Sequence, residues 1–153
     1  MIRPIVKHPD PVLRQLSVPL GTVSDETRAL LDDMLETMYA APGRGLAAPQ
    51  IGVLQRAIVL DVEWKTGAKN PMVLVDPEIV WASDTTATGQ EGCLSIPDTP
   101  VQVTRPDRVK VRYLDRNGAA QEVEAEGPLA MVLQHEIDHL DGVLILDRDA
   151  GAA

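Results

Sequence analysis

The chain has 153 residues, of which 44% are hydrophobic, and a formal net charge of −9. This length fits a single domain over residues 1–153, and the hydrophobic fraction suffices for one core. The negative charge argues against a nucleic-acid surface, because phosphate binding requires clustered Lys and Arg. One cysteine cannot form an internal disulfide, and neither a signal peptide nor an apolar run of about 18 residues is present. We therefore expect a cytoplasmic protein that binds neither nucleic acid nor a membrane.

Helix signals come first along the chain. Ser24 suits the position before a helix, and Asp25 and Glu26 would lie in its first turn. Pro42-Gly43 ends the segment. Apolar residues recur at helical spacing and predict a face buried in the core: Leu30, Leu31, Met34, Leu35, Met38 and Tyr39.

Strand signals dominate the middle of the chain. We expect strands at residues 57–62, 72–75, 101–103, 109–114 and 121–125. Arg116-Asn117-Gly118 suits the turn of a hairpin between the last two. A second helix should run from Pro128 to about Leu140, with Gly142 just past its end. The predicted fold class is α+β, with mainly antiparallel sheets around this central helix.

The second predicted helix carries the motif H-E-x-x-H, from His135 to His139. Histidines four residues apart project from the same helix face, so both imidazoles can bind one metal ion. Glu136 then lies beside the open coordination position, where a carboxylate can carry a proton. This layout is typical of a metal-dependent hydrolase.

Such a site needs a third protein ligand, with one position left for water or substrate. The extended motif H-E-x-x-H-x-x-G-x-x-H is excluded, because Ile145 stands where its third histidine belongs. A thermolysin-type glutamate is also absent, since no glutamate follows His139. The remaining candidates are His8, an aspartate in the tail and Cys93. His8 stands in a proline-rich stretch where an exposed side chain is expected.

Cys93 lies between Gly92 and the sequence Leu-Ser-Ile-Pro. A lone cysteine is most often a small buried hydrophobic residue. This one follows a glycine in a tight segment whose backbone N–H groups can point into a cavity. One thiolate with two imidazoles suits iron, zinc, nickel or cobalt.

Three short motifs stand in order along the chain. G-x-G-x-A-A-x-Q occupies residues 43–50, E-G-C-L-S occupies 91–95 and Q-H-E-x-D-H occupies 134–139. In order and approximate spacing they resemble the peptide deformylases, which remove the N-formyl group from the initiator methionine of nascent chains. The similarity runs from the N-terminus to about Asp147.

The resemblance implies a role for each matching residue. Cys93, His135 and His139 would bind one divalent ion, with Fe²⁺ favoured natively and Zn²⁺, Ni²⁺ or Co²⁺ also suitable. Glu136 would act as general base and acid. Gln50 and the backbone N–H of Leu94 would stabilise the oxyanion. The expected partner is an N-formylated peptide.

The first motif also bears on substrate binding. Gly45, together with Gly92 of the second motif, would allow a peptide backbone to approach closely, as pairing with a sheet edge requires. Arg44 occupies a position that is usually apolar in the family and close to the first substrate side chain. Its guanidinium either stays in water with the stem along the wall or faces the substrate and changes selectivity.

Two other functions stay open at this stage. A paralogue acting on another formylated or acylated amine is suggested by Arg44 and by the short sequence after His139. A metal-binding adaptor without turnover is the non-enzymatic alternative. The presence of Glu136 and Gln50 argues against it, because neither residue is needed to hold an ion. Many bacterial deformylases continue into a C-terminal helix that in some docks on the ribosome. Residues 143–153 suffice only for a short strand and a tail, so ribosome contact by that route is not supported.

Overall fold

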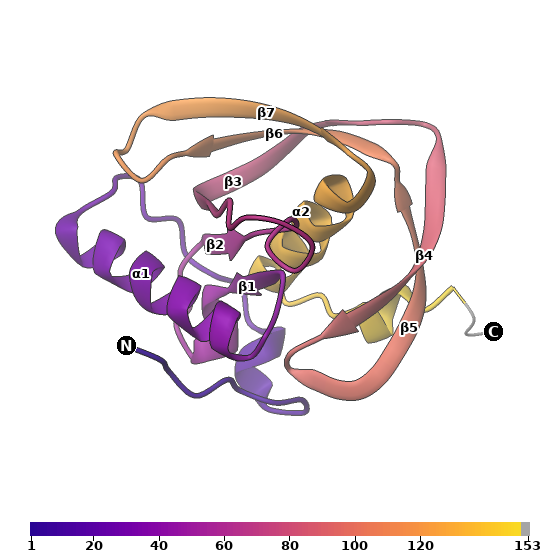
Figure 1. The fold of residues 1–153 in the computed structure, drawn as a ribbon, viewed down its shortest axis with the longest axis horizontal. Helices are drawn as coiled ribbons and strands as arrows, with labels where there is room; N and C mark the ends of the chain where they lie inside the picture. The colour runs from indigo at the N-terminus through magenta and orange to yellow at the C-terminus, as the bar shows by residue number, and fades with distance from the viewer. Residues whose placement is uncertain (151–153) are drawn as a thin grey trace.

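Two antiparallel sheets and two α-helices form the described part, residues 1–150, of this computed structural model (Figure 1). The helices are α1 (Asp25–Ala40) and α2 (Gly127–Leu140). The strands are β1 (Gly45–Ala47), β2 (Ala57–Leu60), β3 (Met72–Ala82), β4 (Thr86–Cys93), β5 (Ile96–Pro106), β6 (Arg108–Leu114) and β7 (Ala120–Glu126). Three 3-10 segments connect them: η1 (Pro11–Arg14), η2 (Ala48–Ile51) and η3 (Ile145–Arg148). The predicted α+β class is confirmed.

The larger sheet has the strand order β1-β2-β3-β6-β7, with every neighbouring pair antiparallel. Strands β4 and β5 form a separate two-stranded sheet. Helix α2 lies between the two sheets and packs against strands of both (Figure 1). The residues of H-E-x-x-H lie in the second half of this helix.

Helix α1 begins as the sequence predicts. The Ser24 Oγ accepts from the Thr27 N–H at 3.2 Å, and the Thr27 Oγ1 accepts from the Ser24 N–H at 3.2 Å. This reciprocal cap satisfies two backbone donors at the first turn. Met34 and Met38 on the inner face are fully buried beside β1 and β2, so these methionines belong to the core.

Helix α2 ends where Gly142 adopts a left-handed φ of 73°. A Cβ on Gly142 would lie 2.5 Å from the Arg14 carbonyl oxygen, so only glycine fits this turn. Leu133 and Leu140 are fully buried in the core between α2 and the larger sheet. At its start, Pro128 takes the second helical position rather than the predicted first.

The extent of several strands differs from the prediction. Strands β3 and β5 are longer than expected, and β1 and β4 were not predicted. Residues 143–150, which are long enough for a short strand, contain η3 at 145–148 and a single antiparallel bridge between Asp149 and Val103. The Asp147 carboxylate accepts from the Leu144 N–H at 2.9 Å and turns the chain there. The last part of the predicted tail, residues 151–153, lies outside the described residues.

In residues 1–150 no helix combines the length and apolar character needed to cross a membrane.

Candidate active site

Cys93, His135 and His139 come together at one point. Their ligand atoms all lie within 4.8 Å of one another, and the Cys93 Sγ is 3.3 Å from the His139 Nε2. The two histidines are one turn apart on α2, whereas Cys93 ends β4. The packing of α2 against the β4-β5 sheet therefore assembles the set. His8, the rejected third ligand, is exposed and lies outside this cluster.

The donor set fits a divalent ion. One sulfur and two imidazole nitrogens suit zinc, iron, nickel or cobalt. The imidazole of His139 is buried, and burial lowers the pKa of His139 to about 3, so it is a neutral ligand near pH 7. Its Nδ1 has no hydrogen-bond partner among the described residues. The site is therefore shaped for a cation rather than for a protonated histidine pair.

His135 lies among negative groups. Burial alone lowers the pKa of His135, but the charge of Glu136 and contacts with Cys93 and Glu91 outweigh it and raise this pKa to about 10. Without an ion, the surrounding anionic groups thus favour a positive charge at His135. A divalent cation would supply that charge and leave both imidazoles neutral.

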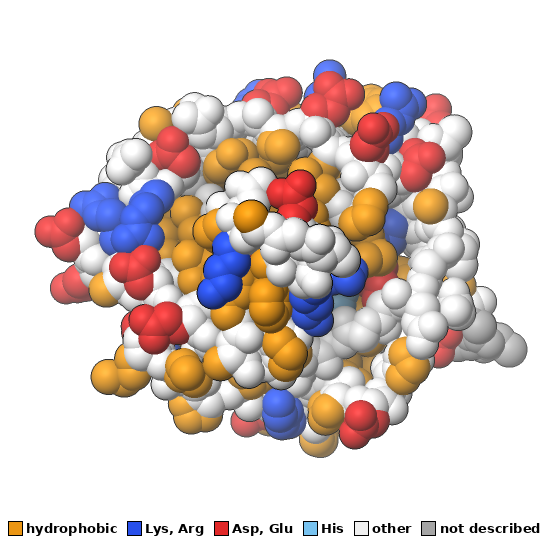
Figure 2. Space-filling view, viewed as in Figure 1, with side chains coloured by type: hydrophobic (Ala, Val, Ile, Leu, Met, Phe, Trp, Pro, Cys, Tyr) orange, Lys and Arg blue, Asp and Glu red, His pale blue; other side chains and the backbone are white. Residues whose placement is uncertain are grey.

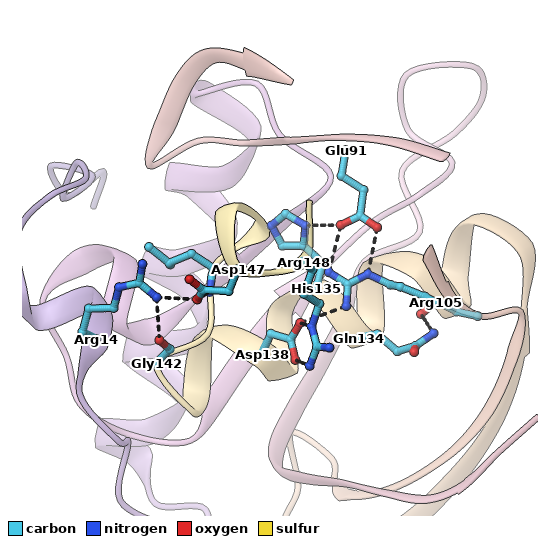
Figure 3. A network of polar contacts seen from close by, with 11 residues as sticks. Arg14, Glu91, Arg105, Gln134, His135, Asp138, Gly142, Asp147 and Arg148 are labelled. Atoms are coloured by element: carbon cyan, nitrogen blue, oxygen red, sulfur yellow. Dashed lines mark hydrogen bonds and ion pairs between the residues drawn. The ribbon is translucent and has the colours of Figure 1, made fainter. Parts of the chain in front are cut away.

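Glu91 orients the first histidine. Its Oε1 is 3.0 Å from the His135 Nδ1, which leaves the Nε2 to face the centre (Figure 3). The Glu91 carboxylate also accepts two hydrogen bonds from Arg105, at 2.8 and 3.0 Å. Both side chains are buried, and these partners hold the pKa of Glu91 below its usual value although burial acts to raise it. Glu91 is therefore ionised and fixed in place.

The same network continues through α2. The Arg105 Nη1 donates to the Asp138 Oδ2 at 2.9 Å, and Asp138 also accepts two hydrogen bonds from Arg148 of η3 (Figure 3). The chain of contacts thus joins β4, β5, α2 and η3 behind the metal ligands. The sequence placed Glu91 and Asp138 inside motifs, but no signal in it marked Arg105 or Arg148 as part of the site.

Loss of the Glu91 charge should weaken ion binding. Glu91→Gln should reduce the affinity of the protein for Zn²⁺ or Co²⁺ by about 10- to 100-fold, because groups that orient a ligand contribute that much. Competition against a chelator of known affinity measures this. Glu124→Gln, an exposed change on β7, is the matched control. Equal affinities in both variants would show that Glu91 does not support His135.

Glu136 is buried beside the ligands. Burial raises the pKa of Glu136 to about 7, although nearby His135 and Arg105 act to lower it. The Glu136 Oε1 has no hydrogen-bond partner among the described residues. On the opposite wall, a Cβ on Gly45 would lie 2.5 Å from the Glu136 Oε2. A carboxyl group with a pKa near neutrality in a confined space is suited to accept and return a proton.

Gln50 stands on the other side of the cysteine. Its Oε1 accepts from the Ala47 N–H at 2.9 Å, so its amide nitrogen points toward β4. That nitrogen donates to the Ser95 Oγ at 3.1 Å and lies 3.7 Å from the Cys93 Sγ. Leu94 occupies the turn between Cys93 and Ile96, directly after the thiol. The Gln50 amide nitrogen is thus positioned next to the centre, and Leu94 follows the thiol directly in the chain.

A cavity of about 410 Å³ opens onto these groups. Arg44, Gly45 and Gly92, the predicted substrate-binding residues, all line it. So do Gln50, Cys93, Leu94, His135 and Glu136. His139 lies behind Cys93 and is fully buried. The structure therefore brings the predicted site residues other than His139 to one pocket, with His139 directly against Cys93.

The fold and this pocket define a metal-dependent hydrolase with a Cys-His-His centre. Residues 2–152 match the family model described as polypeptide deformylase. The chain is 56% identical over 147 residues to a peptide deformylase of Phenylobacterium zucineum, covering 96% of this chain and 87% of that protein. It therefore belongs to the peptide deformylase family, hydrolases that remove the N-formyl group from nascent peptides.

Solved structures agree with this assignment. A peptide deformylase from Synechococcus elongatus in complex with actinonin is 42% identical, with a TM-score of 0.93 over 99% of this chain and 84% of that chain. A class I type b peptide deformylase from Acinetobacter baumannii, with Met-Ala-Ser bound, is 35% identical, with a TM-score of 0.89 over 97% and 98% of the two chains. The fold that positions α2 and the β4-β5 sheet is thus the fold of this family.

Proposed function

We propose that Cys93, His135 and His139 hold one Fe²⁺ ion in the cell and that the site deformylates peptides that begin with formyl-methionine. The observation that carries this proposal is the meeting of three ligand atoms, Glu136 and the Gln50 amide at one cavity. The relative crystallised with Met-Ala-Ser supports methionine as the first residue. A substrate made at the ribosome places this activity in the cytoplasm, and residues 1–153 form one catalytic domain.

The bound ion would supply a hydroxide-like nucleophile near neutral pH and polarise the formyl oxygen. Glu136 takes the proton of the attacking water and returns it to the amine, which cannot leave as an anion. Its raised pKa of about 7 suits both steps, because the group can gain and lose a proton at neutral pH. The close approach of Gly45 keeps this carboxylate in a confined position.

Gln50 and Leu94 stabilise the negative oxygen that forms during attack. The Gln50 Nε2 and the Leu94 backbone N–H are donors fixed before the reaction, so they need no rearrangement when charge develops. The Ala47 N–H holds the Gln50 side chain in this orientation. One N–H of the Gln50 amide stays on the Ser95 Oγ, and the other, on the side of Cys93, is the donor to the oxyanion.

The peptide lies along the open edge of the larger sheet. β1 is an edge strand, paired only with β2, so its second edge is available for an added strand. Gly45 lets the peptide backbone approach this edge, and Gly92 lines the opposite side of the cavity. The extended substrate would then point its formyl end at Glu136.

The identity of the ion is tested by comparing two preparations. Protein purified without oxygen and loaded with Fe²⁺ should deformylate formyl-Met-Ala-Ser faster than the zinc-loaded protein, and this activity should decay in air. Acetyl-Met-Ala-Ser serves as the control substrate. Equal rates for zinc protein prepared in air would contradict the iron assignment while leaving deformylation intact.

A further inference from the structure

We propose that Arg44 and Lys65 form a cationic mouth that favours formyl peptides with Asp or Glu at the second or third residue. This inference rests on the proposed function and adds to it a substrate class. Both residues line the cavity that holds the metal ligands. Both side chains are exposed.

Arg44 lacks the ion-pair partner that most arginines of residues 1–150 have, and Lys65, like the other described lysines, also has none. Seven of the ten arginines in the described residues form an ion pair with a carboxylate. Arg44 forms none within residues 1–150, and neither does Lys65, in a chain with 23 acidic residues and a net charge of −9. An unpaired Arg and an unpaired Lys on one cavity leave a local excess of positive charge that attracts an anionic ligand.

The loop that follows β2 holds the two cations on the same side of the cavity. The Lys65 Nζ donates to the Pro42 carbonyl at 3.1 Å, two residues before Arg44 in the chain. The neighbouring Trp64 donates from its Nε1 to the Gly43 carbonyl at 2.9 Å and packs edge-on against Tyr39 with ring centroids 5.1 Å apart. Lys65 is therefore not a freely moving surface residue.

The base of this loop is fixed as well. The buried Asp61 carboxylate accepts from the Tyr39 hydroxyl at 2.7 Å. It also accepts from the backbone N–H groups of Glu63 and Trp64, each at 3.1 Å. Arg44 and Lys65 carry the same charge and repel each other. An anion bound between them would be attracted by both and would relieve this repulsion.

The location of the pair indicates which part of the peptide it meets. The buried floor of the cavity is formed by Glu136 and His135, so the formyl group and the first residue lie there. Arg44 and Lys65 lie at the exposed mouth, where a later residue must pass. Figure 2 shows Lys and Arg side chains near the middle of this face, with hydrophobic side chains between them and some of them beside the pale blue of a histidine.

The acidic residues of the cavity do not cancel this charge. Glu91 is neutralised by Arg105, to which it is paired at 2.8 Å. Asp98 is exposed on β5, which forms the other sheet. A peptide carboxylate at the mouth would therefore meet the two cations, whereas Asp98 would attract a basic residue of the peptide.

The test compares isosteric peptides on the metal-loaded enzyme. Formyl-Met-Glu-Ser and formyl-Met-Ser-Glu are each paired with the peptide that has Gln in place of Glu. The ratio of kcat/KM for Glu over Gln should be about three- to tenfold at low salt for at least one pair, because exposed ion pairs contribute little each and are screened. In the double variant Arg44→Gln, Lys65→Gln this ratio should fall to about one. The double variant Arg112→Gln, Lys110→Gln removes the same charge from β6 and should keep the wild-type ratio.

Three results would overturn the proposal. A Glu over Gln ratio of one in the wild type removes the selectivity. A Glu over Gln ratio that is unchanged in the Arg44→Gln, Lys65→Gln variant would show that other residues cause the selectivity. A preference seen only between formyl-Glu-Ala-Ser and formyl-Gln-Ala-Ser places the cations at the first side chain instead. If the fully metal-loaded protein turns over no formyl peptide, both the proposed function and the selectivity are overturned. If it turns over Glu and Gln peptides equally well, only the selectivity is overturned.

Discussion

Replacing Glu136 with Gln should lower kcat by about 10²- to 10⁴-fold while the ion stays bound, because an amide cannot carry the proton that general acid–base catalysis moves. Glu136 is not one of the three clustered ligand residues, and its Oε1 has no hydrogen-bond partner among the described residues. Its substitution therefore leaves the ligand set intact. Metal analysis and steady-state kinetics on the same sample measure both effects.

Two outcomes would contradict this role for Glu136. Turnover within a few-fold of wild type would remove the residue from the mechanism. Loss of the ion would make Glu136 a structural group. Glu124→Gln on β7 is the control for removing one carboxylate, and it should change neither the metal content nor kcat.

Replacing Cys93 with Ala should remove the ion and the activity together. Two imidazoles alone bind a divalent ion weakly. The affinity for the ion should therefore fall by more than the loss of about 10- to 100-fold expected for Glu91→Gln. His8→Ala is the control, because His8 is exposed and lies outside the ligand cluster. Metal content after gel filtration and deformylation rate are the readouts. Full occupancy in Cys93→Ala would show that the third ligand is a different residue.

The helices and the two histidine ligands of the site could be predicted from local sequence. Ser24 and Gly142 mark helix ends through backbone chemistry that depends on a few neighbouring residues. His135 and His139 share a helix face because of helical periodicity alone. The approach of Cys93 to them follows from tertiary packing, and without the resemblance to a family His8 and a tail aspartate were still open.

The parts that sequence reasoning missed depend on long-range contacts. Strand β4 is mostly exposed and polar, and Gly89 and Gly92 lie within it, so its strand state comes from pairing with β5 rather than from its own pattern. Arg105 and Arg148 are separated by 43 positions in number and meet only through Asp138. No local periodicity predicts such a contact.

The sequence left two positions open for the Arg44 guanidinium, one in water and one facing the substrate. The side chain lines the cavity and is exposed, so its guanidinium is not buried without a partner. The comparison of Glu and Gln peptides tests whether the guanidinium contacts the second or third residue of the substrate.

The most direct test of the central claim is the measurement of formate released from formyl-Met-Ala-Ser by protein of known metal content. We expect one ion per chain and one formate for each free amine formed. Activity should disappear after chelation and return when the ion is restored. Absence of formate from protein that carries a full complement of Fe²⁺ at Cys93, His135 and His139 would contradict the account.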